Sequence, residues 1–164
     1  MKRFLVVVAV FAMSVVALPV NAISDNQVEV IKERCESIRD NLKVVQKNDA
    51  KARVHLGGRF ETVLSKFIMP LNMRLVENGL PSAELVENQN DFSKAKTIFV
   101  NDYINYQQEL EELVAMDCKN EPKQFYEKLE KVRQKRKMME QDVMKLRTLI
   151  TNQIKIVTGL RSKI

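Results

Sequence analysis

The chain has 164 residues, a length typical of one domain, and 45% of them are apolar, enough for a hydrophobic core and too many for disorder throughout. Its 27 basic and 21 acidic residues give a net charge of +6. With only 4 Gly, 4 Pro and no Trp, it lacks the turn residues that a β-sandwich, a β-barrel or an alternating β/α fold needs, so we expect an all-α fold.

The first 22 residues have the pattern of a secretory signal peptide. Two basic residues precede an uncharged apolar run over 4–18, Pro19 ends the run, and Ala22 provides a small residue at a cleavage site. The alternative is an uncleaved membrane anchor, but the run is shorter than the roughly 20 residues that a span needs. We therefore expect cleavage after Ala22, export to the extracellular space or the cell envelope, and a single helical domain over 23–164.

The domain holds two cysteines, Cys35 and Cys118, and exported proteins fold in an oxidising compartment. Two cysteines allow a single intramolecular disulfide, which would close a large loop and stabilise the fold by about 4 kcal/mol. Two buried free thiols and an intermolecular bridge are the alternatives. The C-x-x-C spacing of a redox enzyme is absent.

A first long helix is expected over 24–76, opened by a capping box at Ser24 and Gln27. Its apolar positions alternate steps of three and four, as in a coiled-coil seam, with Asp49 as a polar exception. The seam consists of Val28, Ile31, Cys35, Ile38, Leu42, Val45, Ala52 and Leu56, and then, with a shift, of Phe60, Val63, Leu64, Phe67, Leu71 and Leu75. Gly57-Gly58 permits a bend or a close helix contact, and Pro70 permits a kink.

Two further helices are expected over 91–116 and 122–161, after a connection over 77–91 that holds at most one helical turn at 83–86. The seam of the second helix consists of Phe92, Ala95, Phe99, Tyr103, Tyr106, Leu110 and Leu113. The third helix begins at Pro122, which suits the first helical position, and its seam continues for five heptads. That seam consists of Phe125, Leu129, Val132, Arg136, Met139, Val143, Leu146, Ile150, Gln153, Val157 and Leu160.

Short connections make neighbouring helices antiparallel, so we expect an elongated antiparallel three-helix bundle with coiled-coil-like packing. If Cys35 and Cys118 lie at one level, residue numbers at each level of the first two helices sum to 153, and the third helix is offset from the first by 83 residues. With this alignment, the end of the third helix near Leu160 lies level with Glu77, where the first helix stops. Residues 24–34 extend beyond the other helices, where they either fray or hold a partner.

This register brings polar residues of all three seams into one slice. Asp49 lies level with Tyr103 and Tyr106 and within about one turn of Arg136, and Arg53 follows one turn later. Because Arg offers a planar fork of donors to a carboxylate, we expect a buried or half-buried network of these side chains. Its functional interpretation is a binding pocket. We favour the structural one, a lock on the register of the helices.

Charge is sorted along the chain, with a net charge of −6 over 83–121 and +8 over 122–164. The simplest interpretation is that the second and third helices have complementary faces. The remaining positive charge can bind an anionic polymer or lipid headgroups weakly, through Lys128, Lys131, Arg133, Lys135 and Lys137. No aromatic residue follows Tyr126, so a base-stacking platform for specific nucleic-acid readout is absent.

Residue types that carry chemistry are scarce. His55 is the only histidine, and neither a G-x-S-x-G elbow nor a phosphate-binding loop is present. We therefore expect no enzyme activity, no metal and no cofactor. The 8 Met residues are interpreted as core filler, although Met138, Met139 and Met144 can instead line an adaptable apolar surface.

Several short motifs follow one another in a distinctive order: Cys35, Asn48-Asp49-Ala50, Arg53-Val54, Leu56-Gly57, Leu71-Asn72, Arg74, Asp117-Cys118, Pro122, Phe125-Tyr126, Arg133 and Arg136. In these motifs, over about residues 35–147, the chain resembles a family of small exported all-helical bacterial proteins with a paired cysteine. The resemblance implies an exported helical fold and a cysteine pair, and it implies no activity.

Two functional hypotheses follow from the sequence. The first is a non-catalytic secreted or cell-surface interaction protein, which binds a protein or an envelope component through an exposed helix face or through residues 24–34. The second is a chaperone-like or polyanion-binding envelope protein that uses the basic third helix. The oligomeric state stays open.

Overall fold

The computed structural model describes residues 23–80 and 83–161, so the expected signal peptide lies outside the described residues. The all-α prediction is confirmed, because every regular element in these residues is helical. The elements are α1 (Asp25–Glu33), α2 (Cys35–Thr62), the π-helix η1 (Val63–Ile68), α3 (Met69–Glu77), α4 (Ala83–Ala115) and α5 (Pro122–Arg161).

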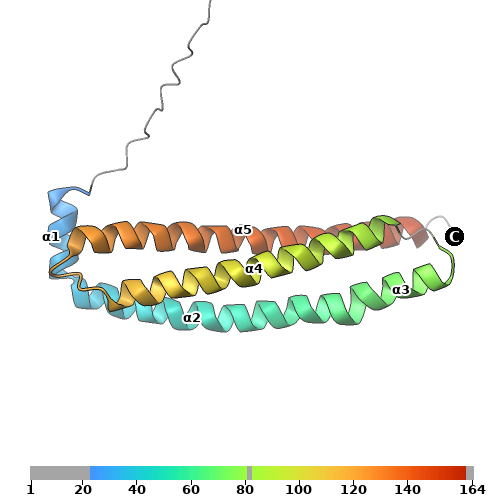
Figure 1. Cartoon of the computed structure of the whole chain (residues 1–164), viewed down its shortest axis with the longest axis horizontal. Helices are drawn as coiled ribbons and strands as arrows, with labels where there is room; N and C mark the ends of the chain where they lie inside the picture. Colours follow the sequence, from blue (N-terminus) through green and yellow to red (C-terminus); the bar gives the residue numbers. More distant parts are fainter. Residues whose placement is uncertain (1–22, 81–82, 162–164) are drawn as a thin grey trace, which may run out of the picture.

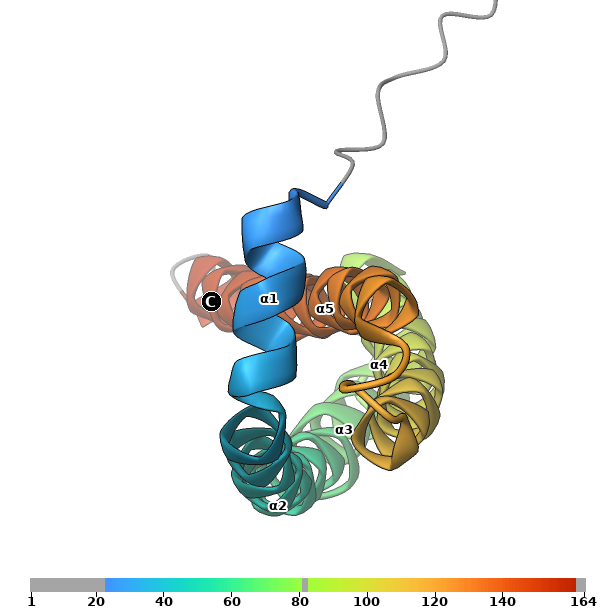
Figure 2. The same cartoon turned by 90° about the vertical axis from the view of Figure 1, so that its left-hand side faces the viewer.

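Three long rods lie side by side (Figure 1). The first rod is made of α2, η1 and α3, which follow one another without a break; α4 returns along it, and α5 runs out again. The view from one end shows that α4 packs against both other rods, whereas the backbones of α2 and α5 lie further apart (Figure 2). Side chains span the gap between these two helices, with Arg136 of α5 bonded to Asp49 of α2, and we call this side of the bundle the open side.

The first expected helix is not continuous. It breaks at Arg34 (φ −103°, ψ 14°), and α1 crosses the end of the bundle from α2 to α5 (Figure 2). The prediction that residues 24–34 project beyond the bundle is therefore wrong. The bend lets α1 pack against α5 and buries Ile31 in the core cluster that also contains Phe125. The predicted capping box is present, with the Gln27 amide donating to Ser24 Oγ at 3.3 Å and the Ser24 amide donating to Gln27 Oε1 at 2.9 Å.

The expected connection over 77–91 is also too long. Asn78 and Gly79 end α3: the Leu80 amide donates to the Leu75 carbonyl at 2.9 Å, and Gly79 has a positive φ of 65°. However, α4 already begins at Ala83. The reason is a buried stripe of Leu85, Asn88 and Phe92, which extends the seam of α4 towards its N-terminus.

The π-helix η1 accounts for a further difference. The residues buried along this part of the rod are Phe60, Leu64, Ile68 and Asn72, which are four positions apart throughout. Such spacing needs a helix wider than 3.6 residues per turn, and the Met69 amide accordingly donates to the Leu64 carbonyl, five residues back. Pro70 has no amide hydrogen to donate to residue 66, which favours this widening.

Two expectations for the first rod are not met, the seam position of Phe67 and a close helix contact at the two glycines. Phe67 was expected in the seam, but the π-helix turns it outward and leaves it 65% exposed. Gly57 and Gly58 lie inside α2, and a Cβ added to either would meet no atom within 4 Å, so neither serves a close helix contact.

The core has two clusters along the bundle. Near α1 it contains Cys35, Tyr106, Leu110 and Phe125. Further along, Phe60 meets Phe92 and Phe99 edge-to-face, with ring centroids 6.2 Å and 6.0 Å apart.

Candidate functional site

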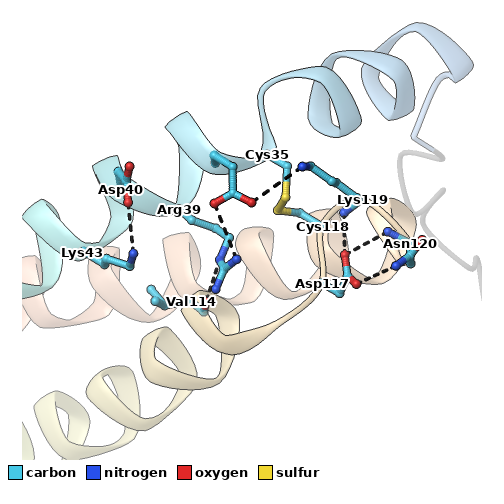
Figure 3. Close-up of polar contacts among 10 residues, drawn as sticks. Cys35, Arg39, Asp40, Lys43, Val114, Asp117, Cys118, Lys119 and Asn120 are labelled. Atoms are coloured by element: carbon cyan, nitrogen blue, oxygen red, sulfur yellow. Dashed lines mark hydrogen bonds and ion pairs between the residues drawn. A yellow bond between two sulfur atoms is a disulfide. The ribbon is translucent and has the colours of Figure 1, made fainter.

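A disulfide joins Cys35 to Cys118, with the two Cα atoms 5.5 Å apart (Figure 3). It ties the first residue of α2 to the turn between α4 and α5. The intramolecular pairing, one of three alternatives left open by the sequence, is therefore the one present. Beside it, the Arg39 guanidinium donates to the Val114 carbonyl at 3.1 Å and ties α2 to the end of α4.

The turn that carries Cys118 is held by its own side chains (Figure 3). Asp117 Oδ1 accepts from the amides of Lys119 and Asn120 at 3.0 Å and 3.1 Å, and these hydrogen bonds to Asn120 and Lys119 lower the pKa of Asp117. Lys119 also lies 3.8 Å from Glu36 of α2. The end of the bundle that carries the disulfide is thus fixed by covalent and polar contacts.

Asp49, Tyr106 and Arg136 form a network that we call the ionic layer. Arg136 donates to both carboxylate oxygens of Asp49, at 2.9 Å and 3.1 Å, and the Tyr106 hydroxyl donates to Oδ2 at 2.7 Å. Burial of the ring and the hydrogen bond to Asp49 both raise the pKa of Tyr106. The Asp49 side chain is 14% exposed and that of Arg136 is 47% exposed, so the layer is open on the α5 side.

Tyr103, the fourth residue expected in this network, lies beside it without joining it. Its hydroxyl donates to Gln107 Oε1 at 3.1 Å instead of to Asp49. Arg53 stacks over its ring at 5.0 Å from the centroid, a cation–π contact. Burial is the main cause of the raised pKa of Tyr103.

A second polar network, the amide layer, lies towards the other end and consists of Asn72, Asn88, Gln89 and Gln153. Asn72 Nδ2 donates to Gln89 Oε1 at 2.8 Å, Asn88 Nδ2 donates to Gln153 Oε1 at 2.7 Å, and Gln153 Nε2 donates to Asn72 Oδ1 at 3.3 Å. Asn72 and Asn88 also donate to the carbonyls of Leu85 and Leu149. The layer joins all three rods without any charge.

Sequence reasoning missed the amide layer. Asn72, Asn88 and Gln153 are only 3%, 7% and 5% exposed. A prediction from hydrophobic periodicity nevertheless assigns amide side chains to the surface. The available signal was Gln153, which falls on the seam of the third helix.

A cavity of about 390 Å³ opens between α2 and α5, next to the ionic layer. Phe99 and Tyr103 of α4 form its floor, and Leu56 and Val143 line the two walls. Met144 is 60% exposed at its edge. This volume lies in the range of ordinary ligand sites, and the apolar floor beside a few charged groups is typical of binding surfaces.

Most of the basic residues proposed to bind polyanions contact acids of this chain. Lys128 pairs with Glu109 and Glu112, Lys135 lies 3.7 Å from Glu109, and Arg133 pairs with Glu130. The hydrogen bond from Lys128 lowers the pKa of Glu109. In the part of the chain that the structure describes, Lys131 and Lys137 form no ion pair, and both are exposed.

Asp142 of α5 has a less favourable environment. Its Oδ2 atom is buried and has no hydrogen-bond partner among the described residues. Burial and the neighbouring carboxylate of Asp102 raise the pKa of Asp142.

No family model, curated protein or solved structure matches the chain. Within residues 23–80 and 83–161, no helix is long and apolar enough to cross a membrane. In the same ranges, no group of three or more His, Cys, Asp or Glu residues is placed to hold a metal ion.

The groups assembled at the ionic layer satisfy one another. The Asp49 carboxylate accepts three hydrogen bonds, from Arg136 and Tyr106. The arrangement is suited to fixing the helices and shaping a cavity.

Proposed function

We propose that this chain is an exported, non-catalytic interaction protein, built as an elongated antiparallel three-helix bundle with coiled-coil-like packing. It binds another protein or an envelope component at the open side between α2 and α5. The observation that carries the proposal is the cavity of about 390 Å³ there, with its apolar floor and charged edge. Because α1 bends at Arg34 and packs on the bundle, we place the binding surface at the open side and not at residues 24–34.

Export is supported by the basic and apolar pattern of the first 22 residues and by a disulfide, which persists in oxidising compartments. The test is N-terminal sequencing of the protein recovered from cell fractions of its producer. We expect an N-terminus at Ile23 in the envelope or medium fraction. A retained Met1 in the cytoplasmic fraction would contradict export.

Binding at the open side can be tested by photo-crosslinking in the producing cells. A photoreactive residue replaces Met144 at the cavity, and a matched variant carries it at Ile104, which is 45% exposed on α4 and does not line the cavity. We expect an adduct from position 144 and none from 104. Equal adducts from both positions, or none from 144 in a variant with a normal melting curve, would refute the proposed site.

Binding of polyanions by α5 is the second candidate, supported by the exposed Lys131 and Lys137. It ranks lower because Lys128, Arg133 and Lys135 already have acidic partners. Such binding depends steeply on salt, since it releases counterions. The test is a heparin column. Polyanion binding predicts that wild type is retained at 50 mM salt and released at 300 mM salt, and that a Lys131→Ala/Lys137→Ala variant is not retained at 50 mM salt.

A further inference from the structure

We propose that the open side accepts one amphipathic α-helix of a partner protein, which carries an acidic residue against Arg53 and Arg147 and completes a four-helix arrangement. The inference rests on the proposed function, and it adds the shape and charge of the ligand. Four observations carry it: a second cavity, a repeat that connects the two cavities, the length of the resulting groove and the charges along it.

A second cavity, of about 230 Å³, opens between the first rod and α5 further along. Phe67 and Leu71 line it from the first rod, and Ile154 and Val157 line it from α5. Phe67 and Ile154 are 65% and 58% exposed. Large apolar side chains that stay in solvent while they line a concavity mark an interaction surface more often than isolated exposed residues do.

The two cavities lie along the same faces of the helices that line them. On α5, Glu140, Val143 and Met144 of the first cavity recur 14 residues later as Ile154, Val157 and Thr158 of the second. Two heptads separate each pair, so these residues share one face of α5.

The first rod repeats in step with α5. Its residues Ala52, Arg53 and Leu56 recur 15 residues later as Phe67, Ile68 and Leu71. The extra residue is the one that the wider turns of η1 accommodate, so both cavities also share one face of this rod. We call the two cavities together the open groove.

The length of the open groove fits a helix. It extends from Asp49 to Leu71 on the first rod and from Arg136 to Thr158 on α5. Each wall spans 23 residues, or about 33 Å for the 22 steps of 1.5 Å between its first and last residue. Both walls present side chains at steps of three and four, which is the pattern into which an amphipathic helix packs. A compact ligand would fill the first cavity only.

The charges of the open groove favour an acidic partner. The charged residues that line the first cavity are three arginines and two acids, a net charge of +1, and Asp49 among them is paired with Arg136. Arg53 and Arg147 have no carboxylate within 4.0 Å among the described residues. A Glu or Asp on the apolar face of the incoming helix would give these two guanidinium groups a carboxylate partner, in addition to the Tyr103 ring that Arg53 already contacts.

The test extends the crosslinking experiment to both cavities, in the full chain exported by its producer. The photoreactive residue is placed at Met144 or at Ile154, and the adducts are mapped by mass spectrometry. We expect both positions to label the same partner protein, at sites about ten residues apart that lie on one helix next to an acidic residue. Arg147→Glu should reduce labelling from Met144 about tenfold. Lys145→Glu, a matched change at an exposed residue outside the groove, should leave it unchanged.

The outcomes separate this inference from the proposed function. An adduct at Met144 without one at Ile154, an adduct of small-molecule or lipid mass, or an adduct with a second copy of this chain would overturn the helix proposal and leave binding at the open side standing. Labelling that Arg147→Glu and Lys145→Glu reduce equally would overturn the acidic contact. Absence of an adduct at Met144 would refute both proposals. Melting curves of all variants establish that each is folded.

Discussion

The ionic layer and the amide layer occupy the same three rods and use opposite chemistry. The ionic layer combines a carboxylate, a guanidinium and a phenol, and Arg136 is 47% exposed beside a cavity. The amide layer is neutral and closed, with Asn72, Asn88 and Gln153 at most 7% exposed. Since an exposed ion pair contributes little to stability and an unpaired buried amide costs more, the closed layer should matter more for folding and the open layer more for binding.

The two ends of the bundle also differ in their covalent restraint. The disulfide and α1 hold the end near the ionic layer, whereas the amide layer lies towards the turn at Gly79. The molecule therefore has one end fixed by a crosslink and another fixed by neutral hydrogen bonds.

Removal of the crosslink should have the largest effect. We expect Cys35→Ala/Cys118→Ala to lower the free energy of unfolding by about 4 kcal/mol, because the disulfide closes a loop with a sequence separation of 83 residues. Urea denaturation measures the loss. Hydrogen exchange should show amides freed in α1 and at the start of α2, with protection kept around the amide layer. Wild type in reductant should match the variant, and unchanged stability would contradict the role of the disulfide.

Disruption of the amide layer should come next. Asn88→Ala removes two hydrogen bonds and leaves Gln153 Oε1 without its donor, so we expect a loss of about 2–3 kcal/mol. Asn90→Ala, an exposed asparagine of the same helix, is the control and should have little effect. Thermal melting in low and high salt should give the same loss, because no charge is involved. A loss no larger than that of Asn90→Ala would argue against the layer.

Disruption of the ionic layer should cost less. We expect Asp49→Ala to destabilise the protein by about 1–2 kcal/mol, since Tyr106 loses its acceptor while the half-exposed Arg136 can turn to solvent. Asp40→Ala, whose carboxylate is 71% exposed, should lower the melting temperature far less. In 1 M salt the loss from Asp49→Ala should shrink, unlike that from Asn88→Ala. Equal melting temperatures for the two aspartate variants would show that the ionic layer does not stabilise the fold.

The smallest effect should be a gain that depends on pH. The raised pKa of Asp142 means that the folded state holds this proton more tightly than the unfolded state does. Its stabilising contribution is complete below the ordinary value of 3.8 and is lost as pH rises through the folded-state pKa. Asp142→Asn should therefore melt higher than wild type at pH 7 and no higher at pH 3, whereas the exposed Asp91→Asn should show no such gain.

Much of the helical framework could be predicted from apolar spacing. The third expected helix, 122–161, coincides with α5, because its seam continues without a break after a proline at the first position. The pairing of Cys35 and Cys118 then aligned the helices well enough to bring Asp49 near Tyr106 and Arg136. The contacts with Arg136 fall 87 residues apart instead of 83, a difference of about one turn.

The differences arise where tertiary contacts, not local periodicity, decide the structure. The bend at Arg34 depends on burial of Ile31 against the end of the bundle, which no local signal predicts. The early start of α4 was hidden because Asn88 replaces an apolar residue in its seam. Tyr103 lies at the level that the register predicts, but its hydroxyl donates to Gln107, one turn away on the same helix.

The π-helix η1 also affects how relatives of this chain should be recognised. A chain with the same groove on an uninterrupted α-helix would have one residue fewer between Leu56 and Leu71. Its sequence would align with this one only after a single-residue gap in that segment. Since a heptad frame assigned before the gap is displaced by one position after it, a search for remote relatives should score residues 35–62 and 69–77 as separate frames.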